Sequence, residues 1–320
     1  MKPSVYITRK LPDEVVQPLL EKFTVRMWES EEVAVPRDVL LQESERADAL
    51  LTMISDSIDA ELMGAAKNLK VISNLAVGFN NIDTEAAKQR GIVVTNTPDV
   101  LTETTADLTF ALVMAAARRM TSAERALRDG EWTSWSPLGF TGQDVWGTTI
   151  GIIGMGRIGE AVARRAKGFG MDVLYCNRSR NADAEEMLGA LRKELDELLA
   201  ESDHVVMLAP YTDETAGMIG ARELALMKPT ASFICASRGG IVDEDALYDA
   251  LKKGTIWAAG LDVYATEPVP SNHPLLSLPN VTAVPHIGSA SVRTRMEMMR
   301  VSMQAITDVL EGKSPKHRVV

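Results

Sequence analysis

The sequence predicts an α/β protein built from two doubly wound parallel-sheet domains. Residues 4–95 alternate short apolar runs with helix-like patterns, and a second series of the same kind begins at Ile150. A long apolar helical stretch separates the two series. Alternating strands and helices favour parallel sheets covered by helices, and a length of 320 residues suits about two domains.

The first series contains five strand candidates, each a short run of aliphatic or β-branched residues. The stretch from Asn96 to Pro98 interrupts the pattern, and a helix predicted from about Thr104 to Met120 leads away from it. We therefore expect the chain to cross into the second domain there. The candidates are Val5–Ile7, Val25–Trp28, Ala49–Leu51, Val71–Ser73 and Ile92–Val94.

The second series contains six strand candidates, the number in a full doubly wound sheet. Helices are predicted between them from Asp183 to Glu201 and from Val242 to Lys252, with Gly254 as the C-terminal stop of the second. The candidates lie near residues 150–153, 172–176, 204–208, 231–235, 257–262 and 281–284.

A last helix, Ser291 to Leu310, follows the second series. Its methionines recur at helical spacing, which favours packing rather than a cofactor site. The first domain otherwise lacks a closing helix, so we expect this segment to return to it. The predicted domains are residues 1–98 with 288–320, and residues 99–287.

The stretch from Thr149 to Arg180 has the features of a dinucleotide site. An apolar strand meets a glycine turn, and a helix and a second strand follow at 161–169 and 171–176. The first glycine allows the sharp turn, the second lets the backbone approach a pyrophosphate, and the third lets the helix pack on the strand. Glycines beside a turn are also ordinary loop chemistry, so the flanking strands and helix decide the assignment. The turn is Gly154-Met155-Gly156-Arg157-Ile158-Gly159.

The end of the second strand indicates which nicotinamide cofactor is bound. An acidic residue there would accept a hydrogen bond from the ribose 2′-OH, but this chain has Asn177 followed by Arg178, Ser179 and Arg180. Two arginines and a hydroxyl suit a 2′-phosphate. We therefore predict NADP(H), and the alternative is a solvated charged loop before the next helix.

The composition excludes several classes of function. A formal net charge of −10 argues against nonspecific nucleic-acid binding, and no run approaches the ~18 apolar residues of a membrane span. The N-terminal sequence enters a strand without a secretory pattern. Cys176 and Cys235 fall in apolar runs, which predicts buried thiols, no metal cluster and a cytoplasmic protein.

The segment from about 120 to 147 resembles an arm. Trp132, Trp135, Phe140 and Trp146 lie there among glycines, prolines and small polar residues. Tryptophans at such density usually bury themselves against a partner surface. We expect a homodimer, and the alternative is an arm folded back on its own subunit.

Three polar runs follow the last strands, at the edge where open α/β sheets bind ligands. They bring together a cation, a carboxylate and an imidazole. Hydride delivery to a ketone requires a proton donor, a role that suits His286, and a paired carboxylate, Glu267, would orient it. Arg238 can grip the carboxylate of a 2-oxo acid. The runs are Ala236–Gly240, Gly260–Pro268 and Val284–Ser289.

These motifs together resemble the D-2-hydroxyacid dehydrogenase family, and most closely its glyoxylate/hydroxypyruvate reductases. The resemblance covers essentially the whole chain and keeps the family's order of motifs. The matching runs are Asn74–Asp83, Asn96–Thr102, Thr105–Asp107, the glycine turn, Ser237–Gly240, Ala259–Val263 and Pro285–Ala290.

The resemblance implies a Rossmann dinucleotide-binding domain and a discontinuous, flavodoxin-like substrate domain, with catalysis between them. Arg238 would hold the substrate carboxylate, Glu267 would pair with His286, and His286 would protonate the carbonyl. The backbone N–H groups of Val77 and Gly78 would form a second carboxylate clamp. Asp262 would hold the nicotinamide carboxamide, and the further cofactor contacts would be Thr105, Pro210, Ala236, Ser237 and Gly288.

One departure from the family concerns the Arg238 loop, because Cys235 stands where the family usually has Asn. The implied activity is NADPH-dependent reduction of glyoxylate or hydroxypyruvate. Two alternatives remain open: a D-lactate-type or other 2-ketoacid reductase, and a nucleotide-sensing relative without enzymatic activity.

Overall fold

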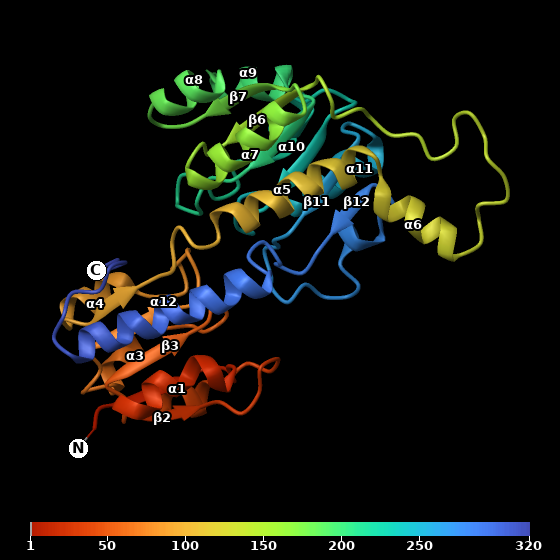
Figure 1. Ribbon diagram of the computed structural model, residues 1–320. Coiled ribbons are helices and arrows are strands. Elements are labelled where there is room, and N and C mark those ends of the chain that lie inside the picture. Colours follow the sequence, from red (N-terminus) through yellow and green to blue (C-terminus); the bar gives the residue numbers. More distant parts are fainter. Residues whose placement is uncertain (1) are drawn as a thin grey trace. The chain divides into compact units, whose positions relative to one another are not determined.

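The computed structural model describes residues 2–320, and the chain divides into two compact units (Figure 1). Unit 1 contains the residues up to Leu101 together with Ala290–Val320, and unit 2 is Thr102–Ser289. Each unit has one parallel sheet. The predicted α/β class with two parallel sheets is confirmed.

Unit 1 has a five-stranded sheet in the order β2-β1-β3-β4-β5, in which every strand pair is parallel. This is the flavodoxin-like order. Its strands are β1 Ser4–Ile7, β2 Thr24–Met27, β3 Ala49–Thr52, β4 Val71–Asn74 and β5 Val93–Thr95, and its helices are α1 Asp13–Lys22, α2 Arg37–Ser44, α3 Ala60–Ala65, α4 Thr84–Gln89 and α12 Val292–Leu310.

The helices of unit 1 cover its sheet because each has an apolar stripe. α12 contacts β3, β4 and α1, and its Met303 and Ile306 are buried. A core with Leu50 and Ile72 at its centre includes residues of α2, α3 and α4. The methionines of α12 therefore serve packing, as their spacing predicts.

Unit 2 has a seven-stranded sheet in the order β12-β11-β10-β9-β6-β7-β8. The strands are β6 Thr149–Ile153, β7 Asp172–Cys176, β8 Leu191–Arg192, β9 His204–Met207, β10 Ser232–Cys235, β11 Ala258–Leu261 and β12 Val281–Ala283. The helices are α5 Thr102–Ala117, α6 Met120–Arg128, α7 Arg157–Gly168, α8 Ala182–Leu188, α9 Leu195–Glu201, α10 Ala221–Leu226, α11 Glu244–Lys253 and the 3₁₀ helix η1 Pro274–Ser277.

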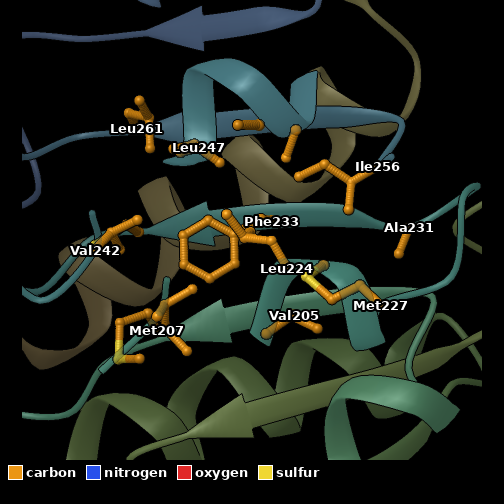
Figure 2. Close-up of a cluster of buried hydrophobic side chains, with 14 of the residues drawn as sticks. Val205, Met207, Leu224, Met227, Ala231, Phe233, Val242, Leu247, Ile256 and Leu261 are labelled. Atoms are coloured by element: carbon orange, nitrogen blue, oxygen red, sulfur yellow. The ribbon is translucent and has the colours of Figure 1, made fainter. Parts of the chain in front are cut away.

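Both faces of this sheet are buried, which is why its strands read as continuous apolar runs. One face packs on α9, α10 and α11, and Figure 2 shows Phe233 of β10 among the apolar side chains there. Ile234, the next residue, belongs to the core on the opposite face, with α5 and α7. The strands thus alternate between two cores.

Two helix predictions for unit 2 are wrong in detail. The predicted helix from Asp183 to Glu201 is broken at Gly189, which has a φ of 64°, and the chain then forms β8 and a new helix, α9. β8 adds a seventh strand to the six predicted. The helix predicted to end at Met120 ends at Ala117, and Arg119 is left-handed with a φ of 50°.

The segment predicted as an arm begins with the helix α6 and continues as an irregular chain that extends away from the sheet of unit 2 (Figure 1). Trp135 is 78% exposed, Trp146 is 76% exposed and Leu138 is 83% exposed. Such a density of exposed apolar side chains is typical of a binding surface. Within residues 2–320 no helix is both long and apolar enough to cross a membrane.

Candidate active site

The glycine turn lies where the strand order of unit 2 reverses, between β6 and β9. Ligands of doubly wound sheets bind at such a reversal. Gly154 has a φ of 103°, and a Cβ there would lie 2.4 Å from the backbone N of Ala209, which follows β9. A Cβ on Gly159 would lie 2.6 Å from the carbonyl oxygen of Gly154. Only glycine therefore fits at either position.

The start of α7 suits an anionic group. Gly156 is the N-cap residue, and no side chain caps the helix. A Cβ on Gly156 would meet nothing within 4 Å, so the approach to the turn is open. Uncapped N–H groups at a helix N-terminus attract phosphate. Met155 of the turn is buried, and Arg157 and Ile158 begin the helix. The turn therefore fits a dinucleotide pyrophosphate.

The loop after β7 carries the residues predicted to select the cofactor. Asn177 is held by the turn itself: its Oδ1 accepts from the N–H of Met155 at 2.7 Å, and its Nδ2 donates to the Met155 carbonyl at 3.1 Å. Arg178, Ser179 and Arg180 are exposed, and Nη1 of Arg178 lies 3.2 Å from Oε2 of Glu214. The side-chain amide of Asn177 thus fixes the shape of the glycine turn, and the exposed Arg178 and Arg180 follow it in the chain.

A third cation, Arg192, was missed by the sequence reasoning. It lies on β8, and its Nη2 donates to the carbonyl oxygens of Asn177 at 3.1 Å and Arg178 at 3.4 Å. The predicted long helix obscured β8, and Gly189 was the one signal that a helix ends before it. Arg192 adds positive charge and hydrogen bonds to the same loop.

Asp262 organises the loop that carries the histidine. Its carboxylate accepts the N–H of Ile287 at 2.6 Å and of Gly288 at 2.9 Å, and its carbonyl oxygen accepts the N–H of His286 at 2.9 Å. A Cβ on Gly288 would lie 3.0 Å from Asp262 Oδ2 and 3.3 Å from Thr105. Three of the predicted cofactor contacts, Thr105, Asp262 and Gly288, therefore lie together.

Arg238 follows the end of β10. Its Nη1 donates to the Ser237 carbonyl at 2.6 Å, and burial lowers the pKa of the guanidinium, while the charge of Glu267 opposes that shift. An arginine stays charged under these conditions. Ala236 is buried at the strand end, and the exposed Pro210 follows the neighbouring β9.

The carboxylate and imidazole predicted to work together are paired. Glu267 Oε2 lies 2.7 Å from His286 Nδ1, and Glu267 Oε1 accepts the Tyr264 N–H at 3.0 Å. Both side chains are about one-third exposed, so they remain accessible. This pairing assigns Nδ1 to the carboxylate and leaves Nε2 as the nitrogen that can exchange a proton with a ligand.

The charges around the pair favour an ionised Glu267. Burial raises the pKa of its carboxyl, but the hydrogen bonds from His286 and from the Tyr264 N–H, together with the charges of His286 and Arg238, outweigh burial and hold that pKa below its usual range. Burial raises the pKa of Asp262, although hydrogen bonds from the N–H groups of Ile287 and Gly288 act in the opposite direction. Glu267 therefore remains a carboxylate partner for the imidazole at neutral pH.

The predicted carboxylate clamp lies in unit 1, after β4. The carbonyl oxygen of Val77 accepts from Asn96 Nδ2 at 2.7 Å, and that of Gly78 accepts from Asn74 Nδ2 at 2.9 Å. Within the described part of the chain, the N–H groups of these two residues have no acceptor. The loop is thus fixed through its carbonyl groups, and its N–H groups can bind an anion.

Comparisons with known proteins identify the family. Residues 110–288 match the model described as D-isomer specific 2-hydroxyacid dehydrogenase, NAD binding domain. The glyoxylate reductase of Thermococcus gammatolerans is 51% identical over 319 residues, covering 98% of this chain and 95% of its own.

Two solved structures extend the likeness to the whole fold. A protein from Thermus thermophilus has a TM-score of 0.93 at 43% identity, covering 99% of this chain and 100% of its own. An NADPH-dependent glyoxylate/hydroxypyruvate reductase from Sinorhizobium meliloti, solved with NADP and malonate, has a TM-score of 0.86 at 33% identity, covering 100% and 97%. This chain belongs to the D-isomer-specific 2-hydroxyacid dehydrogenase family.

Proposed function

We propose that this enzyme reduces glyoxylate and hydroxypyruvate with NADPH. The observation that carries the proposal is the His286–Glu267 pair, at 2.7 Å, on the strand-end edge that also holds Arg238 and the glycine turn. Such a set suits proton delivery to the carbonyl oxygen of a 2-oxo acid. By its name the Thermococcus relative acts on glyoxylate, and the Sinorhizobium relative acts on both glyoxylate and hydroxypyruvate.

Each side chain has a separate task in this proposal. The bound nicotinamide cofactor supplies the hydride. His286 donates a proton from Nε2 to the carbonyl oxygen, and Glu267 holds the imidazole in position through Nδ1. Arg238 binds the substrate carboxylate and orients the carbonyl. Val77 and Gly78 stay predicted contacts of that carboxylate.

The loop after β7 supports the proposed preference for NADPH. Arg178 and Arg180 belong to this loop, where they pair with Glu214 and Glu185, and Arg192 donates to the carbonyl oxygen of Asn177. Asn177, whose amide binds the turn, stands where a carboxylate would accept from a ribose 2′-OH. Arginines bind a 2′-phosphate by charge-assisted hydrogen bonds. The Sinorhizobium relative is NADPH-dependent by name, which supports the same assignment.

We assign cofactor binding to unit 2 and the second carboxylate clamp to unit 1, and we propose a homodimer formed through the arm at about 120–147. The exposure of Trp135 and Trp146 supports the dimer. A Trp135→Ser, Trp146→Ser double variant should shift the mass in solution toward the monomer, measured by light scattering. A wild-type protein that is already monomeric would refute the dimer. The cytoplasmic location stays a prediction from the sequence.

Replacing His286 by Ala tests the activity. We expect turnover of glyoxylate to fall by about 10²–10⁴-fold while the dissociation constant for NADPH, measured by fluorescence, stays within about twofold. A His317→Ala variant is the matched control, because His317 belongs to the C-terminal tail of unit 1 and not to the loops of unit 2 that carry the pair. Wild-type protein that binds NADPH but turns over no 2-oxo acid would instead favour a nucleotide-sensing role.

A further inference from the structure

We propose that Glu244, with His273, is a positioning residue that joins the Arg238 loop to the loop carrying Glu267. This inference rests on the proposed function, since it concerns how Glu267 is held against His286. Glu244 is the first residue of α11, next to the N-cap Asp243.

Glu244 makes two contacts with elements that follow it in the chain. Its Oε1 accepts the N–H of Ala265 at 2.7 Å, and its Oε2 lies 3.3 Å from Nε2 of His273. The side chains of Glu244 and His273 are only 20% and 19% exposed. Ala265 itself is exposed, but the carboxylate that accepts its N–H is partly buried, and this charge-assisted hydrogen bond restrains the loop.

The loop from Tyr264 to Pro268 is anchored at consecutive residues. The ring of Tyr264 is buried, its OH donates to the Val284 carbonyl at 3.2 Å, and its N–H donates to Glu267 Oε1. The next N–H, that of Ala265, is the one that Glu244 accepts. The neighbouring N–H groups of Tyr264 and Ala265 therefore each donate to a carboxylate. The first donates to Glu267 of the proposed catalytic pair, and the second donates to Glu244.

The same peptide contacts the Arg238 loop. Gly239 packs so closely on it that a Cβ there would lie 1.7 Å from the carbonyl oxygen of Tyr264. Glu244 and Arg238 also line one small cavity, together with Cys235 and Val263. Glu244 therefore lies where the Arg238 loop meets the Glu267 loop, and its carboxylate can fix the distance between Arg238 and Glu267.

His273 completes the arrangement by orienting Glu244. It precedes η1 as the N-cap residue, and its backbone N–H is bound by Pro270 O at 2.9 Å. Within residues 2–320 its Nδ1 is buried without a hydrogen-bond partner, so Glu244 is the polar contact of the ring. A ring held in this way favours Nε2 as the protonated nitrogen facing Glu244.

Two measurements on the full-length protein test the proposal. Hydrogen exchange without substrate should be about tenfold faster in peptides covering residues 264–268 for Glu244→Ala than for wild type. In the same variant, kcat for glyoxylate should fall about 10- to 100-fold, while the NADPH dissociation constant stays within about twofold. Glu244→Gln keeps an acceptor for Ala265 and should recover most of the kcat.

Controls separate positioning from a general structural effect. Asp245→Asn removes a carboxylate from the same first turn of α11, where Asp245 is exposed, and should leave kcat unchanged. His273→Ala leaves Glu244 without its ring partner and should lower kcat by about 3- to 10-fold. If Glu244→Ala does not fold, Glu244→Asp replaces it, because the shorter side chain withdraws the acceptor and keeps the charge.

The proposal is overturned if Glu244→Ala leaves the exchange of residues 264–268 or the kcat at the wild-type value, or if NADPH binding weakens as much as kcat falls. A wild-type protein that reduces no 2-oxo acid would refute the proposed function alone. The exchange measurement would then still decide whether Glu244 fixes the loop.

Discussion

Replacement of Gly239 by Ala should separate the Arg238 loop from the Glu267 loop. A Cβ at residue 239 would lie 1.7 Å from the carbonyl oxygen of Tyr264 and 2.0 Å from its carbonyl carbon. Both atoms belong to the backbone, so no side-chain rotation relieves the contact. Ordinary contacts between such atoms are about 3.5 Å, so relieving the contact with the carbonyl oxygen requires the two backbones to move apart by about 1.8 Å.

The size of this shift sets the expected loss of activity. Misplacing reacting groups by about 1 Å can lower a rate by about 10²-fold, and Arg238 is adjacent to the substituted residue. We expect kcat/KM for glyoxylate to fall by about 10²-fold or more. Overpacking a fitted contact costs about 1–3 kcal/mol, so the variant should also melt at a lower temperature.

The assay is the oxidation of NADPH with glyoxylate, followed by absorbance and paired with a melting curve for each protein. Gly168→Ala, at the end of α7, is the matched control, because a Cβ there would meet nothing within 4 Å. It should keep wild-type activity. A Gly239→Ala enzyme with normal kcat/KM would refute the close packing of the two loops.

Three further predictions concern the cofactor loop, the acid–base pair and the thiol. Replacing both Arg178 and Arg180 by Ala should raise the KM for NADPH at least about tenfold and that for NADH less than about twofold; equal increases would contradict the NADPH assignment. The lowered pKa of Glu267 means that its carboxylate stabilises the fold above its unfolded pKa, ~4.3, and that this stabilisation is lost as the pH falls through the lower folded value. The difference in melting temperature between wild type and Glu267→Gln should therefore be present at pH 7 and disappear in acid. A difference that grew on acidification would contradict the lowered pKa of Glu267. Burial raises the pKa of Cys235 to about 11, so iodoacetamide at pH 8 should label it only after unfolding. Labelling of Cys235 in the native protein, detected by mass spectrometry, would contradict this prediction.

The fold could be predicted from the sequence where a local pattern carries the information. Buried parallel strands such as those ending at Ile153 and Cys235 are apolar throughout, and Gly154 and Gly254 mark a turn and a helix end by their backbone freedom. The pairing of Glu267 with His286 was expected because parallel strands bring their carboxyl ends to one edge.

The parts that could not be predicted depend on tertiary contacts. β8 has two residues, both with exposed side chains, so no apolar periodicity identifies it within an otherwise helix-like stretch. Arg192 owes its place to that strand. The contact of Glu244 with Ala265 joins residues 21 apart in the chain, and an acidic residue in the first turn of a helix is already explained by the helix dipole alone. Its second role is visible only in the folded chain.

The most direct test of the proposed function is the rate of reduced-nicotinamide oxidation with glyoxylate, hydroxypyruvate and pyruvate, each with NADPH and NADH. We predict fast oxidation of NADPH with glyoxylate or hydroxypyruvate, slower oxidation of NADH, and loss of both rates in His286→Ala. No oxidation with any of the six pairs by a protein that binds NADPH tightly would contradict the proposed reductase.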